Sequence, residues 1–105
     1  MDKAQLIFEA LSSRARRRIL NYLSATSLNA GEIADRFDIS KPALSKHLKI
    51  LEMAELIRKD KQGQFVYYSL NQDRLVNTLY DFAANFCPEG SVLKKESKKL
   101  AKRKQ

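Results

Sequence analysis

The sequence is poor in residues that interrupt or cross-link a chain. Its 105 residues include one cysteine, two prolines, three glycines and no tryptophan. The single cysteine, Cys87, excludes an intramolecular disulfide and leaves any sulfur-rich metal site short of ligands. No apolar run approaches the roughly 18 residues of a membrane span, and the first residues lack the apolar core of a signal peptide. We therefore expect a single-domain, cytoplasmic protein without membrane contact.

Side chains that could support catalysis or bind a metal are equally scarce. His47 is the only histidine, and the positions three and four residues after it are Ile50 and Leu51, which are not metal ligands. Neither a pair of catalytic carboxylates nor a nucleophile with an adjacent base can be identified. The sequence thus predicts no metal, no cofactor and no enzymatic activity.

Positive charge is what the chain has in excess. The formal net charge is +8, and the segment 91–105 holds seven of the 20 lysines and arginines but one of the 12 acidic residues. Such a balance favours phosphate-bearing partners. We divide the chain into a domain at 1–90 and a basic tail at 91–105. The tail is a disordered arm that follows DNA phosphates, a solubilising end or a weak helix.

Hydrophobic periodicity predicts a series of short helices and one hairpin. Apolar residues at helical spacing follow capping residues, and alternating β-prone runs flank Lys61-Gln62-Gly63. The expected helices are 2–11, 14–25, 30–37, 41–54 and 72–86, and the expected strands are 56–60 and 64–70. This order is typical of a winged helix-turn-helix, which is mainly α with a small β-hairpin.

The helix expected at 41–54 has a polar outer face. Leu44, Leu48 and Leu51 recur at helical spacing and would pack against the short helix before them. A recognition helix reads bases near its N-terminus, where lysine and serine donate hydrogen bonds and proline packs on a thymine methyl. A solvated polar face is the alternative. The candidate base-contacting residues are Lys41, Pro42, Ser45 and Lys46.

Other polar residues are candidates for the DNA backbone and the wing. Arginines crowd the first turns of the helix at 14–25, where a solvated turn is the alternative to phosphate contact. Basic residues around Gly63 would bring the hairpin tip to a minor groove, or would merely protect an edge strand from aggregation. These candidates are Arg16, Arg17, Ser40, His47, Lys49, Arg58, Lys59, Lys61, Gln64 and Tyr67.

Residues 29–70 resemble the ArsR/SmtB family of bacterial repressors. The resemblance rests on Gly-Glu-Ile-Ala at 31–34, Ile-Ser-Lys-Pro-Ala-Leu-Ser-Lys-His-Leu-Lys-Ile-Leu at 39–51 and Gly-Gln-Phe-Val-Tyr-Tyr-Ser-Leu at 63–70. It implies a homodimer that represses transcription by occupying a palindromic operator. Metal-sensing members carry ligands that are missing here, since 28–37 has no cysteine and 71–87 no histidine. The chain is therefore similar to metal-independent autorepressors.

The resemblance also implies dimerisation through the first and last helices of the domain. Their apolar residues exceed what one small core needs, which agrees with this implication. Alternatively, both apolar faces close the core of the monomer. The candidate interface residues are Leu6, Ile7, Ala10, Leu75, Leu79, Phe82 and Phe86.

Two alternatives to a simple DNA-binding repressor remain open. Some family members sense oxidants through cysteines, and Cys87 could form an intermolecular disulfide in a thiol-responsive repressor or be a buried thiol. The fold could also be a protein-interaction module whose basic surface meets an acidic partner. Such a module need not keep Lys41, Ser45 and Lys46 free on an outer face.

Overall fold

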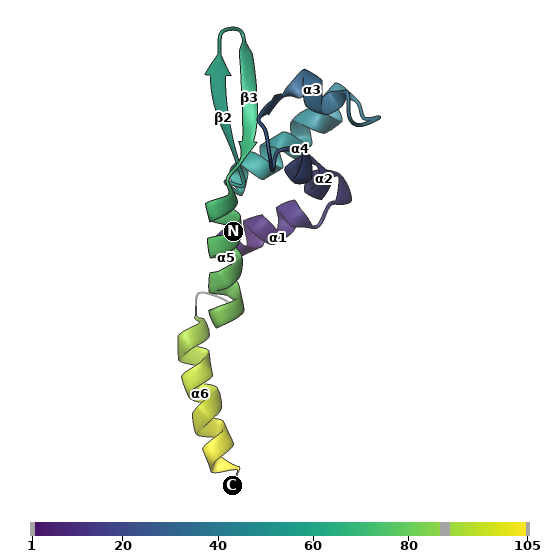
Figure 1. The fold of residues 1–105 in the computed structure, drawn as a ribbon. Helices are drawn as coiled ribbons and strands as arrows, with labels where there is room; N and C mark the ends of the chain where they lie inside the picture. The colour runs from purple at the N-terminus through teal and green to yellow at the C-terminus, as the bar shows by residue number, and fades with distance from the viewer. Residues whose placement is uncertain (1, 87–88, 105) are drawn as a thin grey trace.

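The structure is a computed structural model that describes residues 2–86 and 89–104 (Figure 1). Its elements in chain order are α1 (Lys3–Leu11), α2 (Arg14–Tyr22), β1 (Leu28–Asn29), α3 (Ala30–Ala34), α4 (Lys41–Met53), β2 (Ile57–Gln62), β3 (Phe65–Leu70), α5 (Gln72–Asn85) and α6 (Gly90–Arg103). The predicted fold class, mainly helical with a small β-hairpin, is confirmed.

Side-chain caps determine where the helices begin. A polar side chain before the helix accepts a hydrogen bond from the backbone N–H three residues on, which satisfies a donor that the first turn leaves free. The caps are Asp2 for α1, Ser13 for α2, Asn29 for α3, Ser40 for α4 and Asn71 for α5. These helices therefore start at or within a residue of the predicted positions.

Two helices end earlier than their apolar periodicity suggested. Helix α2 stops at Tyr22 instead of residue 25, and in the turn that follows both the N–H and the hydroxyl of Ser24 donate to the Asn21 carbonyl. Helix α3 stops at Ala34 instead of residue 37, and Phe37 closes the following turn by donating its N–H to the Ala34 carbonyl. The turn between α3 and α4 is thus longer than the sequence indicated.

One apolar core joins the first four helices to the base of the hairpin. Its largest fully buried side chains come from every part of this region, and burial of each stabilises the fold by about 1.5–3 kcal/mol. They are Ile7, Ile19, Ile33, Leu51 and Leu56. Because α4 buries only one side against this core, its other side is free.

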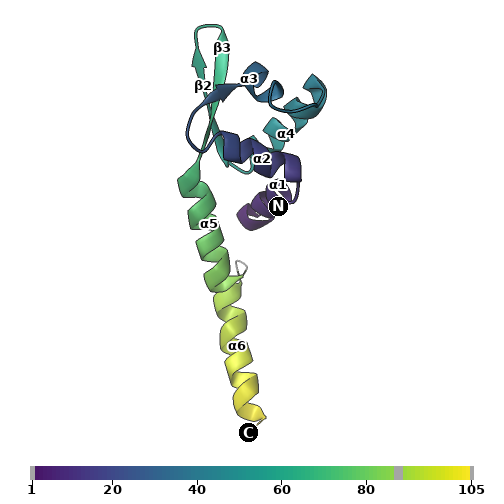
Figure 2. The ribbon, with the colours of Figure 1, turned by 45° about the vertical axis from the view of Figure 1, so that its right-hand side comes forward.

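The sheet has a third strand that the hairpin prediction missed. Strand β1 pairs antiparallel with β3, with Leu28 opposite Tyr68 and Asn29 opposite Tyr67, so that the strand order is β1-β3-β2. The hairpin register runs from Ile57 opposite Leu70 to Gln62 opposite Phe65. Figure 2 shows β1 leading directly into α3 beside the hairpin.

Helix α6 extends the molecule along the direction of α5. In both views α6 continues away from the hairpin, and the chain measures 64 × 24 × 22 Å (Figures 1 and 2). At the junction, the Lys94 ammonium donates to the Ala84 carbonyl and lies over the Phe86 ring. The sequence left open a disordered arm, a solubilising end or a weak helix for the basic tail, and in the structure the tail is helical.

Candidate nucleic-acid interface

The outer face of α4 is polar and free. Pro42, Ser45, Lys46 and Lys49 are all exposed, whereas Leu44, Leu48 and Leu51 are buried on the opposite side. Lys41 at the first position of the helix is exposed too. The four predicted base-contacting residues are therefore all exposed within the first two turns of α4. That they contact bases stays a prediction.

The turn before α4 positions this face. Asn29 and Glu32 form a reciprocal capping box at the start of α3, with distances of 2.8 and 3.0 Å between donor and acceptor. Ile33 of α3 is fully buried in the common core. The Ser40 hydroxyl caps α4 by accepting from the Ala43 N–H at 3.3 Å. Ser40 thus orders the end of α4 that carries the candidate base contacts.

Aromatic and cationic contacts hold the loop between α3 and α4 against α2. The Phe37 ring meets the Tyr22 ring edge to face, with 5.5 Å between their centroids. The Arg18 guanidinium lies over the Phe37 ring at 4.7 Å from its centroid. Arg18 therefore supports the turn, a role that the sequence did not suggest.

The hairpin tip is narrow and carries two of the predicted wing residues. Gly63 has a φ of +64° and is the first residue of a two-residue turn, a position that favours glycine. Lys61 and Gln64 beside it are exposed. Tyr67 lies lower on β3, half-buried and opposite Asn29, with its ring centroid 6.5 Å from that of the exposed Phe65. Phe65 was not among the predicted wing residues.

Two other predicted wing residues lie far from the tip. Arg58 stands opposite Ser69 near the base of the hairpin and donates to the Asn71 side chain at 3.0 Å. Lys59 forms an ion pair with Glu52 at 2.9 Å, and this hydrogen-bonded carboxylate raises the Lys59 pKa. The expectation that both cluster around Gly63 is wrong, because strand β2 runs away from the turn for four to five residues before reaching them.

Arg16 is buried, contrary to its prediction as a phosphate contact. The residue is 7% exposed, and its Nε donates to the Ala10 carbonyl and its Nη2 to the Glu9 carbonyl, both at 2.8 Å. Its remaining amino group, Nη1, lies 3.2 Å from Nδ1 of His47 on α4. These bonds tie α2 to carbonyls in the last turn of α1, where Ser12 also donates to the Glu9 carbonyl, so Arg16 serves the fold.

Arg17 combines a structural bond with an accessible surface. Its Nη1 donates to the Leu11 carbonyl at 2.5 Å, so that it also occupies a free carbonyl at the end of α1. Unlike Arg16, its side chain is exposed. Arg17 therefore remains a candidate for phosphate contact beside the N-terminal half of α2.

The predicted dimer residues separate into two groups. Ile7 and Ala10 of α1 are at most 1% exposed in the core of one chain, so the interface prediction was wrong for both. Leu6, Leu75 and Leu79 are half-buried against that core. Phe82 is half-buried and meets Phe8 edge to face at 4.6 Å, whereas Phe86 is 60% exposed. Of these candidates, Phe86 is the one that leaves the largest fraction of its side chain free.

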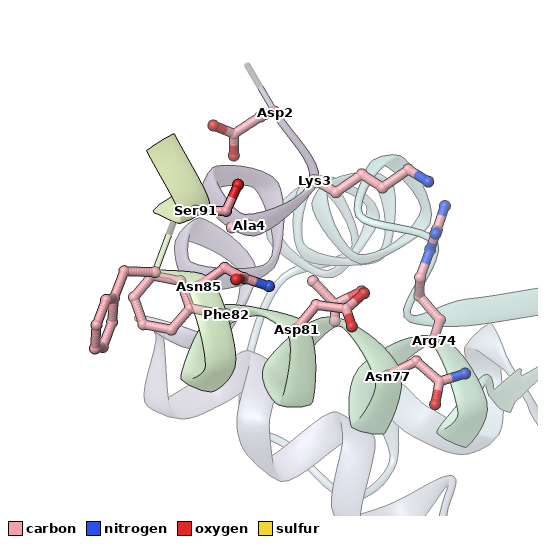
Figure 3. Close-up of a pocket in the computed structure, with 11 residues that line it drawn as sticks. Asp2, Lys3, Ala4, Arg74, Asn77, Asp81, Phe82, Asn85 and Ser91 are labelled. Carbon is pink, nitrogen blue, oxygen red and sulfur yellow. The ribbon is translucent and has the colours of Figure 1, made fainter. Parts of the chain in front are cut away.

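A larger free surface on α5 was not predicted. Val76 and Tyr80 are 53% and 73% exposed and stand four residues apart on one side of the helix. Their spacing could have revealed them, because neither fits the stripe formed by Leu75, Leu79 and Phe82. A groove of about 750 Å³ lies between α5, the start of α1 and the start of α6 (Figure 3).

The side chains of α6 form a basic half-cylinder. At about 100° per residue, six cations fall within one half of the helix circumference, and all are exposed. They are Lys94, Lys95, Lys98, Lys99, Lys102 and Arg103. The other half presents Leu93 and Leu100, 51% and 47% exposed. The charge of the tail is therefore directed to one side.

Cys87, the candidate redox residue, lies outside the described residues. Within 2–86 and 89–104, no three acidic, histidine or cysteine side chains gather in a way that would hold a metal ion. Over the same ranges, every helix falls short of the length and hydrophobicity needed to cross a membrane.

Comparison with known proteins identifies the family to which this chain belongs. A family model described as a helix-turn-helix domain matches residues 11–60. The transcriptional repressor SdpR of Bacillus subtilis is 44% identical over 84 residues, covering 80% of this chain and 92% of SdpR. An ArsR-like transcriptional regulator from Rhodococcus sp. RHA1 has a similar structure, with a TM-score of 0.72, 26% identity and coverage of 98% of this chain and 91% of that one. The chain belongs to the ArsR/SmtB family.

Membership of the ArsR/SmtB family confirms the prediction that the chain is a winged helix-turn-helix transcriptional regulator and not an enzyme. Relatives differ in the direction of regulation given by their names. The transcriptional activator HlyU of Vibrio cholerae is 35% identical over 69 residues, covering 66% of this chain and 64% of HlyU. The chain thus spans about two thirds of HlyU.

Proposed function

We propose that two copies of this ArsR/SmtB chain occupy a palindromic DNA operator and repress transcription by excluding RNA polymerase from the promoter. The observation that carries the proposal is the exposed N-terminal end of α4, where Lys41, Pro42, Ser45 and Lys46 lie within the first two turns. Such a face, held at the start of a capped helix, fits the major groove. The site of action is the bacterial cytoplasm, where the DNA is.

The remaining polar residues would bind the DNA backbone on either side of this helix. Lys49 lies further along the same face, and Ser40 and Arg17 flank its start. Lys61 and Gln64 at the hairpin tip suit the adjacent minor groove. Contacts of this kind position the protein on the duplex, whereas the four α4 residues would distinguish one sequence from another.

The second copy would pack against α5. Val76, Tyr80 and Phe86 leave apolar surface exposed on this helix, and exposed aromatic side chains are typical of interfaces. To match two half-sites, a two-fold axis there would have to set the two α4 helices about 34 Å apart, which is one turn of DNA. The groove beside α5, which Phe82 and Phe86 help to line, would lie next to that contact.

Repression, rather than activation, is favoured by the relative that matches over most of its length. SdpR is named a repressor and is covered to 92%, whereas the activator HlyU is covered to 64%. The DNA upstream of the chain's own gene is the first place to look for the operator, because the chain is similar to metal-independent autorepressors. Metal is not part of the proposal, because the sequence lacks the family's metal ligands in the segments 28–37 and 71–87.

Binding to the chain's own upstream DNA tests the proposal. Purified protein is titrated against the upstream duplex and a scrambled duplex at two salt concentrations, and a reporter gives the direction of regulation. We expect preference for the upstream duplex, two chains per site and lower reporter output. Lys46→Ala should weaken binding, whereas Lys3→Ala, an exposed lysine on α1, should not. Equal binding to both duplexes would contradict the proposal, and so would higher reporter output.

The dimer is tested separately through the α5 surface. Tyr80→Glu places a charge in the proposed interface and should convert dimers to monomers in light scattering. Met53→Glu, which changes an apolar side chain 57% exposed on α4, is the matched control and should leave the dimer intact. A Tyr80→Glu chain that remains dimeric would place the interface elsewhere.

A further inference from the structure

The Arg16 side chain connects the end of α1 to the recognition helix. Two of its nitrogens bond to the Glu9 and Ala10 carbonyls, and Nη1 lies 3.2 Å from Nδ1 of His47. Arg16 is 7% exposed and its guanidinium has three partners, so it holds the imidazole in one orientation. Among the described residues of α4, only His47 has a side chain that is hydrogen-bonded to a side chain of another helix.

The chemistry of this contact determines where the imidazole proton resides. A guanidinium has five N–H donors and no acceptor, so Nδ1 of His47 must accept the bond from Arg16. In the neutral ring, the proton is then on Nε2. In the described part of the chain, no buried side-chain nitrogen or oxygen lacks a partner. Because Nε2 has no protein partner among these residues, its N–H is open to solvent.

The ring is also kept neutral near pH 7. Burial lowers the His47 pKa below its ordinary value, and the positive charge of Arg16 lowers it further. A protonated ring would place a second proton on Nδ1, facing the guanidinium. His47 therefore offers a neutral N–H donor on the flank of α4, one residue after Lys46.

We propose that His47 is a neutral hydrogen-bond donor to a DNA phosphate, and that Arg16 is the positioning residue that fixes its tautomer and orientation. The proposal rests on the proposed function and assigns a role within the same site. A neutral donor differs from the neighbouring lysines because it adds a directional bond without displacing a counterion. It would fix where α4 sits on the backbone while contributing nothing to the salt dependence of binding.

Nitrogen-15 NMR of the free chain tests the tautomer. The sequence holds one histidine, so a tag-free, histidine-labelled sample gives signals from His47 alone. At pH 7 we expect an unprotonated Nδ1 and a protonated Nε2. A proton on Nδ1, alone or together with Nε2, would overturn the proposal whether or not the chain binds DNA.

Two substitutions test the DNA contact on the full chain. His47→Gln keeps a neutral side-chain N–H, whereas His47→Leu removes it. We expect His47→Leu to weaken operator binding about tenfold per half-site, as for loss of one hydrogen bond to a charged group, and His47→Gln to stay within about threefold of wild type. Neither should change the slope of log K against log salt, whereas Lys46→Ala should reduce its magnitude by about 0.9 for each phosphate that is no longer neutralised.

The outcomes separate this proposal from the proposed function. Operator preference in the wild type with unimpaired His47→Leu binding would overturn the His47 role alone. A reduced salt slope in His47→Leu would show a charged contact and would also overturn it. A wild-type chain without operator preference would remove the proposed function, and this role with it. Arg16→Lys, if folded, keeps the positive charge but loses the fork of donors that reaches the two carbonyls and Nδ1 together, so it should mix the His47 tautomers, which a purely packing role of Arg16 would not require.

Discussion

The backbone carbonyl of Asn85 lies so close to Gly90 that a Cβ atom on this glycine would be 1.8 Å from the carbonyl oxygen. Gly90 is buried, although every other described residue of α6 is exposed. The contact joins the last residue of α5 to the first residue of α6. The direction of the basic helix thus depends on the absence of one methyl group.

Gly90→Ala should move α6 without unfolding the domain. A Cβ cannot fit against backbone at that distance, so the junction has to open. We expect small-angle scattering to show an altered maximum dimension, and the melting temperature to change by a few degrees at most, because Gly90 lies outside the core cluster. Gly31→Ala is the control. A Cβ there meets an ordinary 3.4 Å contact, and the change should stabilise the chain by about 0.4–1 kcal/mol. An unchanged scattering profile for Gly90→Ala would contradict the close packing.

Charge on the α6 half-cylinder should contribute to DNA affinity without affecting sequence preference. Lys95 and Lys99 are one turn apart and exposed, so the double change to glutamine leaves the fold intact. We expect the magnitude of the salt slope to decrease by about 0.9 for each phosphate that these lysines neutralise in the wild type, with operator preference retained. Lys104→Gln, outside the half-cylinder, is the control. If the double variant and wild type have equal slopes, Lys95 and Lys99 neutralise no phosphate and the prediction is wrong.

Ser40 should allow helix capping and DNA binding to be separated. Ser40→Asp keeps a side-chain acceptor for the Ala43 N–H and adds a negative charge at a helix N-terminus, so stability should be equal or up to about 1 kcal/mol higher. The same charge would repel a phosphate, and operator affinity should fall at least tenfold. Ser40→Ala should instead lower stability by about 1 kcal/mol in a thermal melt. Undiminished operator binding by Ser40→Asp would show that no phosphate lies near Ser40.

The free energy of unfolding should depend on His47 at mildly acidic pH. The unfolded chain takes up a proton on His47 near the ordinary histidine pKa of about 6.5, whereas the folded chain does so only at lower pH, because burial and then Arg16 lower the His47 pKa. Between these two values the unfolded state binds more protons, so stability falls as the pH falls. Urea titrations at pH 7 and at pH 5.5 measure the effect. His47→Gln should lose less stability over this interval, and an identical loss in both chains would exclude the coupling.

The sequence predicted most of the helices because their signals are local. Ser40, Pro42 and the spacing of Leu44, Leu48 and Leu51 lie within one segment, and the structure confirms both the start of α4 and its buried side. Gly63 likewise indicated the turn between β2 and β3, although the turn is Gly63-Gln64 and not the predicted Lys61-Gln62-Gly63, because β2 continues to Gln62. In each case the residues that determine the structure are close together in the chain, and each points to the same structure.

The missed features depend on contacts between distant segments. Strand β1 has two residues, too few for any periodicity, and its partners Tyr67 and Tyr68 lie about 40 positions away. Arg16 resembles a surface cation in the sequence because its burial depends on the Glu9 and Ala10 carbonyls and on His47 of another helix. Ile7 and Ala10 could not be assigned to core or interface, since apolar periodicity is the same for both.

Asn29 ends β1 and also caps α3, so no linker separates the wing from the helix-turn-helix. Its backbone pairs with β3 while its side chain accepts from the Glu32 N–H. A twist of the hairpin would therefore rotate α3 with it. The recognition helix and the wing would then enter neighbouring grooves with a fixed spacing and orientation relative to each other. A duplex whose helical pitch does not match this spacing would have to overwind or bend to accommodate both. Such a regulator would distinguish operators by their flexibility as well as by their base sequence.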